Sequence, residues 1–176
     1  MSRWQVRRDD TAPSRPNVFV RVPPPTGEAE SSLAIYDKLI CRDGDLSVKF
    51  KIAPTERRVK AVGMVWRYQD QRNYYLLQFS VDEKSVELFH VRNGLQQPIP
   101  AAGARQGVPG VSHDLRANQW YVARVLYRGP TFHVLVGNRE LFVAANDSLR
   151  TGGKTGLWTR DATVASFDDF RSDKKA

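Results

Sequence analysis

The sequence has little of three features that mark well-known protein classes. Only one of its 176 residues is a cysteine, Cys41, so an intrachain disulfide or a zinc site of paired cysteines is excluded. No apolar run approaches the ~18 residues of a membrane-spanning helix. Hydrophobic spacing typical of helices is almost absent, and only Thr26 to Tyr36 is expected to hold a helical turn. We therefore expect a folded β-protein without membrane insertion.

Positive charge exceeds negative charge, but it is dispersed. The chain carries 27 Lys and Arg against 19 Asp and Glu, which gives a formal net charge of +8. Such a balance is compatible with an acidic polymer or nucleic acid as partner. The basic residues occur in short pairs such as Arg7-Arg8 and Lys174-Lys175, whereas a nucleic-acid patch requires clustering. We expect a solvated basic surface, and binding of acidic polymer or nucleic acid is the less favoured alternative.

Apolar and polar residues alternate with a period of two through much of the chain. From Asp45 to Ile52 the alternation has no exception, which indicates a half-buried antiparallel strand. Ala61 to Tyr68 and Tyr74 to Val81 repeat the pattern. Further strands are expected at Trp4–Arg7, Asn17–Val22, Lys38–Cys41, Ser85–Arg92, Trp120–Tyr127, Phe132–Val136, Glu140–Ala144, Thr155–Thr159 and Val164–Arg171.

Turn signals separate these strands. Asn93-Gly94 is typical of a type I′ hairpin, and Gly137-Asn138 is typical of a two-residue loop. Gln97 to Leu115, rich in proline and glycine, is expected to be the longest irregular segment. About a dozen short strands predict an all-β protein, a two-sheet antiparallel β-sandwich that spans residues 1–176 as one domain.

Paired carboxylates of the kind that glycoside hydrolases use are missing. Such enzymes usually need two carboxyl groups about 5–10 Å apart, which one strand would present two or four residues apart. The acidic pairs are expected in turns instead, at Glu28 and Glu30, Asp43 and Asp45, and Asp82 and Glu83. In the adjacent pair Asp168 and Asp169, strand alternation places the carboxylates on opposite faces, with one of them buried against backbone N–H groups or an arginine.

Other catalytic and metal-binding patterns are absent as well. The histidines, His90, His113 and His133, do not have the spacing of zinc ligands. The chain has no G-x-S-x-G elbow and no glycine-rich phosphate loop. We assign no catalytic residue, no metal ligand and no cofactor, and a structural calcium ion remains an alternative.

A binding surface is easier to assemble from the alternation. Trp66, Tyr75 and Trp158 are expected in the core. The outward-facing set is predicted to form one polar-aromatic, ligand-binding surface: Arg67, Tyr74, Gln78, Ser80, Trp120 and Arg124. Sugars are recognised by such mixtures because an aromatic ring packs against the C–H side of a pyranose while polar groups bond its hydroxyls. In the alternative interpretation, the arginines are paired with acids and the face is covered by the Gln97 to Leu115 loop.

Several segments together resemble a known family. They are Asp10-Thr11-Ala12-Pro13-Ser14-Arg15-Pro16-Asn17-Val18, Gly63-Met64-Val65-Trp66-Arg67-Tyr68-Gln69-Asp70 with Asn73-Tyr74-Tyr75, Val91-Arg92-Asn93-Gly94, Trp120-Tyr121-Val122-Ala123-Arg124-Val125, Gly153-Lys154-Thr155-Gly156-Leu157-Trp158-Thr159 and Phe167-Asp168-Asp169-Phe170. Over essentially its whole length the chain resembles the concanavalin A-like lectin/glucanase (LamG-like) superfamily, close to the bacterial 3-keto-disaccharide hydrolase-like domains. The resemblance implies a jelly roll with a concave sheet on which such domains tend to hold glycans. It also implies an extracellular or periplasmic protein whose export segment is not part of the sequence, with a cytoplasmic location as the alternative.

Two functions follow from these observations. The leading hypothesis is a non-catalytic domain that binds a glycan or oligosaccharide, or is structural. The alternative is an enzyme that acts on 3-keto sugars by elimination, a reaction that needs one base rather than a carboxylate pair. Glu87 and His90 are candidate contributors, although alternation places them on opposite faces of one strand. The sequence leaves open whether the protein is an enzyme.

Overall fold

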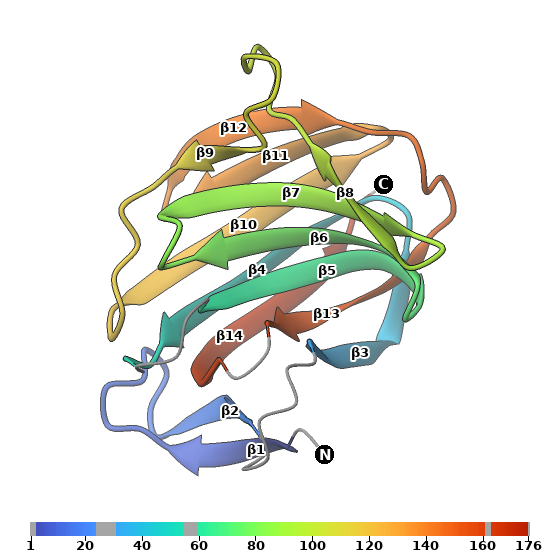
Figure 1. The fold of residues 1–176 in the computed structure, drawn as a ribbon. Coiled ribbons are helices and arrows are strands. Elements are labelled where there is room, and N and C mark those ends of the chain that lie inside the picture. Colours follow the sequence, from blue (N-terminus) through green and yellow to red (C-terminus); the bar gives the residue numbers. More distant parts are fainter. Residues whose placement is uncertain (1–2, 24–30, 55–59, 161–162, 176) are drawn as a thin grey trace.

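The computed structural model describes residues 3–23, 31–54, 60–160 and 163–175. Throughout these ranges the regular elements are β-strands in two stacked antiparallel sheets (Figure 1), which confirms the predicted two-sheet β-sandwich. Sheet A contains, in spatial order, β1 (Arg3–Arg8), β2 (Asn17–Val22), β14 (Ala165–Lys174), β4 (Gly44–Ile52), β10 (Trp120–Arg128), β11 (Thr131–Val136) and β12 (Arg139–Ala145). Sheet B contains β3 (Ser32–Cys41), β13 (Gly153–Thr159), β5 (Ala61–Asp70), β6 (Asn73–Ser80), β7 (Ser85–Arg92) and β8 (Leu95–Ile99), and β9 (Gly110–Ser112) pairs with β7.

The chain crosses repeatedly between the two sheets. Strands β5 to β8 form a meander in sheet B, and β10 to β12 form one in sheet A. The last two strands then return to the middle of the sheets, β13 between β3 and β5 and β14 between β2 and β4. No helix in the described segments is long and apolar enough to cross a membrane.

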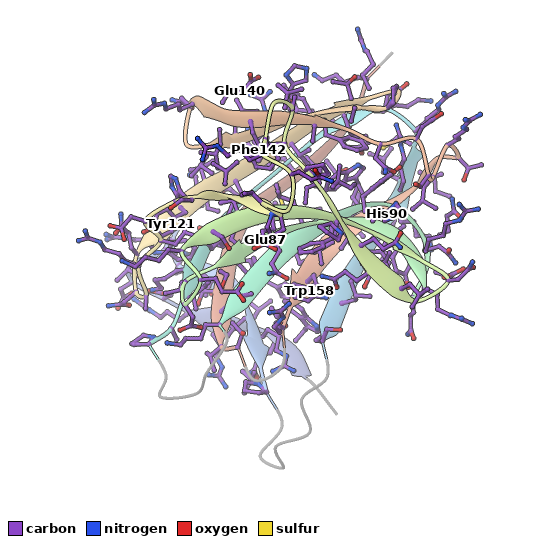
Figure 2. All side chains as sticks on the ribbon, turned by 45° about the horizontal axis from the view of Figure 1, so that its top comes forward. Glu87, His90, Tyr121, Glu140, Phe142 and Trp158 are labelled. Carbon is purple, nitrogen blue, oxygen red and sulfur yellow. The ribbon has the colours of Figure 1, made fainter. Side chains whose placement is uncertain are left out.

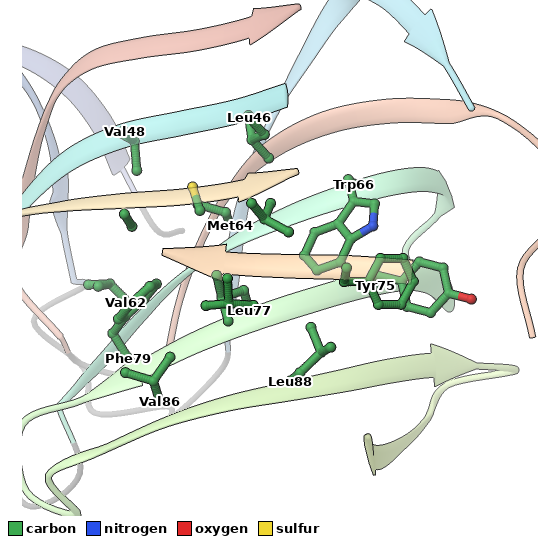
Figure 3. Close-up of a cluster of buried hydrophobic side chains, with 14 of the residues drawn as sticks. Leu46, Val48, Val62, Met64, Trp66, Tyr75, Leu77, Phe79, Val86 and Leu88 are labelled. Carbon is green, nitrogen blue, oxygen red and sulfur yellow. The ribbon is translucent and has the colours of Figure 1, made fainter. Parts of the chain in front are cut away.

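The core lies between the sheets and consists of the inward-facing residues of the alternating strands. Trp66 and Tyr75 of sheet B are both fully buried, as predicted, and their rings stack with centroids 5.6 Å apart. Trp66 also stacks on Tyr127 of sheet A, at 5.8 Å. Figure 3 shows Leu46 and Val48 of β4 in the same cluster. Rings from both layers therefore join the two sheets.

The segment from Gln97 to Leu115, expected to be irregular, contains β9 and the second half of β8. Pro98 in β8 argues against a strand because proline has no N–H to donate to a neighbouring strand. It is tolerated here because β8 is an edge strand. The expected helical turn is also wrong where it is described. Ser32 to Tyr36 belongs to β3, because it pairs with β13, and residues 26–30 lie outside the described part.

The hairpin between β7 and β8 has the predicted turn. Asn93 has φ 53° and Gly94 has φ 82°, so both central residues adopt the left-handed conformation that a type I′ turn requires. Gly137 and Asn138 form the predicted two-residue link between β11 and β12.

Candidate functional site

Arg67 lies inside the sandwich and is only 1% exposed. A bulge in the pairing of β5 with β6, together with φ 45° at Arg67, turns the side chain inward. Its guanidinium donates to three backbone carbonyls, those of Arg42 (2.8 Å), Leu149 (2.9 Å) and Gly129 (2.6 Å). The prediction that Arg67 points outward is therefore wrong, because alternation fails at a bulge.

Tyr74, Gln78 and Ser80 face outward from β6, as the alternation predicts, yet all three are buried. Their exposed fractions are 6%, 1% and 0%. Tyr74 belongs to a second apolar cluster, on the outer face of sheet B, which also includes Trp158. Figure 2 labels Trp158. Trp158 is thus buried as predicted, but outside the space between the sheets. Because all three side chains are buried, none of them offers open surface to a ligand.

Trp120 and Arg124 lie on the outer face of sheet A, on the other side of the molecule. The prediction that all six residues share one surface is therefore wrong. Alternation tells which residues of a strand share a side, but not to which sheet the strand belongs. β6 is in sheet B and β10 is in sheet A, so their outward-facing residues point in opposite directions.

An open hollow of about 510 Å³ lies on the outer face of sheet A. Its lining is mostly polar and comes from β4, β10, β11, β14 and the turn after β11: Asp45, Ser47, Val122, Arg124, Leu135, Gly137, Asn138, Arg171 and Asp173. A second hollow, of about 480 Å³, lies further along the same strands, where it is lined by His133 and Lys175 among others. This face therefore combines accessible polar groups with a concavity.

Arg124 and Asp45 form a two-point ion pair in the larger hollow. Arg124 donates from Nε to Oδ1 at 2.8 Å and from Nη2 to Oδ2 at 2.5 Å, and Lys175 Nζ lies 3.8 Å from Oδ2. The hydrogen bonds from Arg124 hold the pKa of Asp45 below its ordinary 3.8, and those bonds raise the pKa of Arg124. The Asp45 side chain is 10% exposed and the Arg124 side chain 42%, so a nearly buried acid orients a cation whose side chain reaches solvent.

Trp120 is the first residue of β10 and faces the same side of sheet A as Arg124. Its indole Nε1 donates to Thr11 Oγ1 at 3.3 Å, and Lys51 Nζ lies 5.1 Å from the ring centroid. Lys51 is itself held by Asp9, at 2.7 Å. Trp120 and Arg124 are four residues apart on one strand, about 13 Å. The ring and the guanidinium thus flank Val122, which is 36% exposed.

The ion pair beneath Trp120 leads to a pH-dependent prediction. The hydrogen bond from Lys51 lowers the pKa of Asp9 from 3.8 to about 2, so this carboxylate stabilises the folded state above pH 3.8, and that contribution is lost as pH falls towards 2. Asp9→Asn is expected to lower the free energy of unfolding by about 0.5–1 kcal/mol at neutral pH. Urea denaturation of both proteins from neutral pH to about pH 2 should show this difference shrinking across the acid limb. A difference that stays constant down to the lowest pH would contradict the assignment.

Glu87 and His90 point to opposite sides of β7, as predicted. Glu87 is paired with outward-facing Gln78, whereas His90 is paired with Tyr75, which points into the core. His90 Nδ1 lies 2.8 Å from Ser148 Oγ, and Nε2 lies 2.7 Å from Gln97 Oε1. The two candidate bases are therefore not brought together.

Asp168 and Asp169 do not follow the predicted alternation. β14 is irregular between Asp168 and Arg171, and Asp169 has φ 49°. As a result both carboxylates meet Ser14: Asp168 accepts from its backbone N–H at 2.7 Å, and Asp169 accepts from its hydroxyl at 2.6 Å. Neither residue is fully buried, although the predicted bond to backbone N–H is present at Asp168. No group of three or more His, Cys, Asp or Glu side chains in the described residues is arranged to hold a metal ion.

Comparison with known proteins shows the fold. No family model matches the chain, and no curated protein matches it. The carbohydrate-binding module CBM66 from Bacillus subtilis superposes with a TM-score of 0.75 at 15% identity, covering 98% of this chain and 94% of that one. A B. subtilis protein of unknown function with a galectin-like fold gives 0.64 at 10% identity, with 99% and 89% covered. The GH43 protein BlXynB from Bacillus licheniformis gives 0.60 at 15% identity, and the match covers 97% of this chain but 36% of that one.

The chain therefore has a jelly-roll fold of the concanavalin A-like type. The finer resemblance to 3-keto-disaccharide hydrolase-like domains gains no support from these matches and stays a prediction.

Proposed function

We propose that the chain is a carbohydrate-binding domain and that its saccharide lies across the outer face of sheet A. The observation that carries the proposal is the open guanidinium of Arg124, fixed by Asp45 beside a polar hollow, with the Trp120 ring further along the same strand. A fixed guanidinium donates to sugar hydroxyls without losing much side-chain freedom on binding. The Trp120 ring, about 13 Å further along the strand, supplies the apolar contact that the C–H side of another pyranose unit of the same saccharide needs.

The charge of this face favours a neutral saccharide over an acidic polymer. Arg124 is neutralised by Asp45, Lys51 by Asp9, and Lys49 by Asp169 at 2.7 Å. The hollow itself is lined by two acids, Asp45 and Asp173, and two arginines, Arg124 and Arg171, so its lining has no excess of the positive charge that a polyanion requires. The net charge of the chain is therefore a weak guide to its ligand.

Two further observations support a binding role over a catalytic one. The low pKa of Asp45 makes it a poor proton donor, so the best-placed carboxyl group of the hollow is unsuited to act as a general acid. The carbohydrate-binding module CBM66 has the same fold over nearly the full length of both chains. The enzyme hypothesis for 3-keto sugars stays the second candidate, without a base assembled in this hollow.

A glycan array read with matched variants tests the proposal. Arg124→Ala is expected to weaken binding to any neutral oligosaccharide hit by tenfold or more, because a hydrogen bond to a charged group contributes about 1.5–3 kcal/mol. Arg92→Ala, an exposed arginine on β7, serves as the matched control and should leave binding unchanged. Equal losses in both variants, or a loss only in Gln78→Leu on sheet B, would show that the face is wrongly assigned.

A further inference from the structure

The two hollows on the outer face of sheet A are neighbours along β10. Arg124 lines the larger hollow, and Leu126, the next residue of β10 on that face, lines the second one. Charged groups also link them, because Lys175 Nζ of the second hollow lies 3.8 Å from Asp45 Oδ2 of the larger one. The two hollows therefore adjoin one another on one face.

Trp120 extends this row in the opposite direction. From Trp120 to Arg128, eight residues further on, the strand spans about 27 Å. Arg128 lines the second hollow, so that hollow lies towards the end of the strand remote from Trp120. We call the row from the Trp120 ring through the larger hollow to the second hollow the β10 track. It is several times as long as one pyranose ring is wide.

The second hollow offers the mixture of groups that a sugar unit needs. Leu126 supplies carbon surface, and Thr131 supplies a hydroxyl that can donate or accept. His133 Nδ1 lies 2.9 Å from Glu140 Oε2. Because an ionised carboxylate only accepts, Nδ1 carries the proton, and Nε2 of the neutral ring is left to accept a hydrogen bond from a sugar hydroxyl. Glu140 thus orients His133 much as Asp45 orients Arg124.

Both hollows lie on the sheet itself. Their lining comes from β4, β10, β11 and β14, together with the turn after β11 and Lys175. A saccharide laid on such a face is contacted along its side, so its two ends can continue beyond the track.

We propose that the β10 track binds the interior of a linear saccharide chain, with successive sugar units over the Trp120 ring, the larger hollow and the second hollow. The inference rests on the proposed saccharide-binding function and adds the length and the part of the ligand that the site recognises. A disaccharide would contact only part of the track. A longer chain would gain the ring contacts and hydrogen bonds of all three positions.

Oligosaccharides of increasing length test the proposal. Calorimetric titrations would use the disaccharide to the hexasaccharide of four neutral linear series, the cello-, xylo-, manno- and malto-oligosaccharides. In a series that binds, the affinity is expected to rise about tenfold or more from the disaccharide to the hexasaccharide. Equal affinity at both lengths would overturn this inference and leave the saccharide function standing. Binding of no member would count against the saccharide function, and this inference would fall with it.

Matched variants separate the two hollows. His133→Ala is expected to weaken hexasaccharide binding about three- to tenfold and to leave the disaccharide unchanged, because the shorter ligand occupies the larger hollow. Arg124→Ala should weaken both ligands. Gln96→Ala, at an exposed position of β8 in sheet B, is the control that should change neither. An unchanged hexasaccharide affinity in His133→Ala, with the same melting temperature as the parent, would contradict a role for the second hollow.

A long polymer distinguishes the interior of a chain from its end. Titration of the protein with a soluble polymer of the series that binds should saturate with several protein molecules on each chain. Saturation at a single protein molecule per chain would show that a chain end is recognised, and the inference would then be wrong.

Discussion

Replacing Arg67 with alanine is expected to lower the free energy of unfolding by about 3–5 kcal/mol, because the variant loses a buried cation that satisfies three carbonyls. The carbonyl groups of Arg42, Gly129 and Leu149 would each lose a donor. The guanidinium also lies 5.8 Å from the Tyr75 ring centroid and 5.9 Å from that of Phe132, so truncation leaves a gap between packed rings. Urea denaturation followed by tryptophan fluorescence measures the change.

Arg67→Lys is the control for charge alone. A lysine keeps the positive charge but cannot reach three separately placed carbonyls with the fork of a guanidinium. It should recover only part of the loss, and the variant should still unfold less stably than the parent. Full stability in Arg67→Lys, or a cost below about 1 kcal/mol in the alanine variant, would show that the carbonyl network contributes little.

A second large effect is expected at Gly156 on β13, where there is no room for a side chain. An added Cβ would lie 2.4 Å from the Ala34 carbonyl oxygen and 3.1 Å from the Ile35 Cα, both backbone atoms of β3. Because backbone cannot move aside as a flexible side chain does, Gly156→Ala should cost about 2–3 kcal/mol by forcing β3 away from β13.

Gly103→Ala provides the contrast for that substitution. Gly103 has open space around it, but its φ of 77° disfavours any other residue, so the expected cost is about 1–2 kcal/mol from the backbone alone. Thermal unfolding of the two variants, compared with the parent, should rank Gly156→Ala as the more damaging. A reversed order would indicate that β3 adapts to the added methyl group.

The strands could be read from the sequence because half-buried antiparallel strands alternate with a period of two. Asp45 to Ile52 shows this best: its apolar residues all face the core as predicted. The sequence does not predict strands β8 and β9 because both are short and contain turn-forming residues, Pro98 and Gly110. They form strands because they pair with β7.

The candidate site was harder to predict, for two physical reasons. The first is that alternation does not show to which sheet a strand belongs. It therefore predicts one surface for Trp120, Arg124 and Tyr74, although Tyr74 faces the other way. The second is that a bulge reverses alternation. Arg67 and Asp169 both have positive φ, and both place their side chains where the period does not predict. Neither residue is a glycine, and nothing in the sequence marks these bulges.

The ion pairs of sheet A could not be predicted from the sequence either, because their partners lie far apart along the chain. Arg124 and Asp45 are 79 residues apart, and they meet because β10 pairs with β4 so that Arg124 lies opposite Ser47, beside Asp45 on the same face. The acids that pair with Arg124, Lys49 and Lys51 come from other parts of the chain. That pairing leaves the lining of the hollow with as many acids as arginines although the chain as a whole is basic.

The most direct test is an NMR titration of the ¹⁵N-labelled protein with the best neutral oligosaccharide from an array. Binding across the outer face of sheet A predicts shifts in the Arg124 side chain, the Trp120 indole and the amides of Asp45 and Asn138, while Tyr74 and Gln78 stay unchanged. Shifts confined to Tyr74 and Gln78 would move the site to sheet B. The absence of any oligosaccharide that shifts these signals would contradict the carbohydrate-binding function itself.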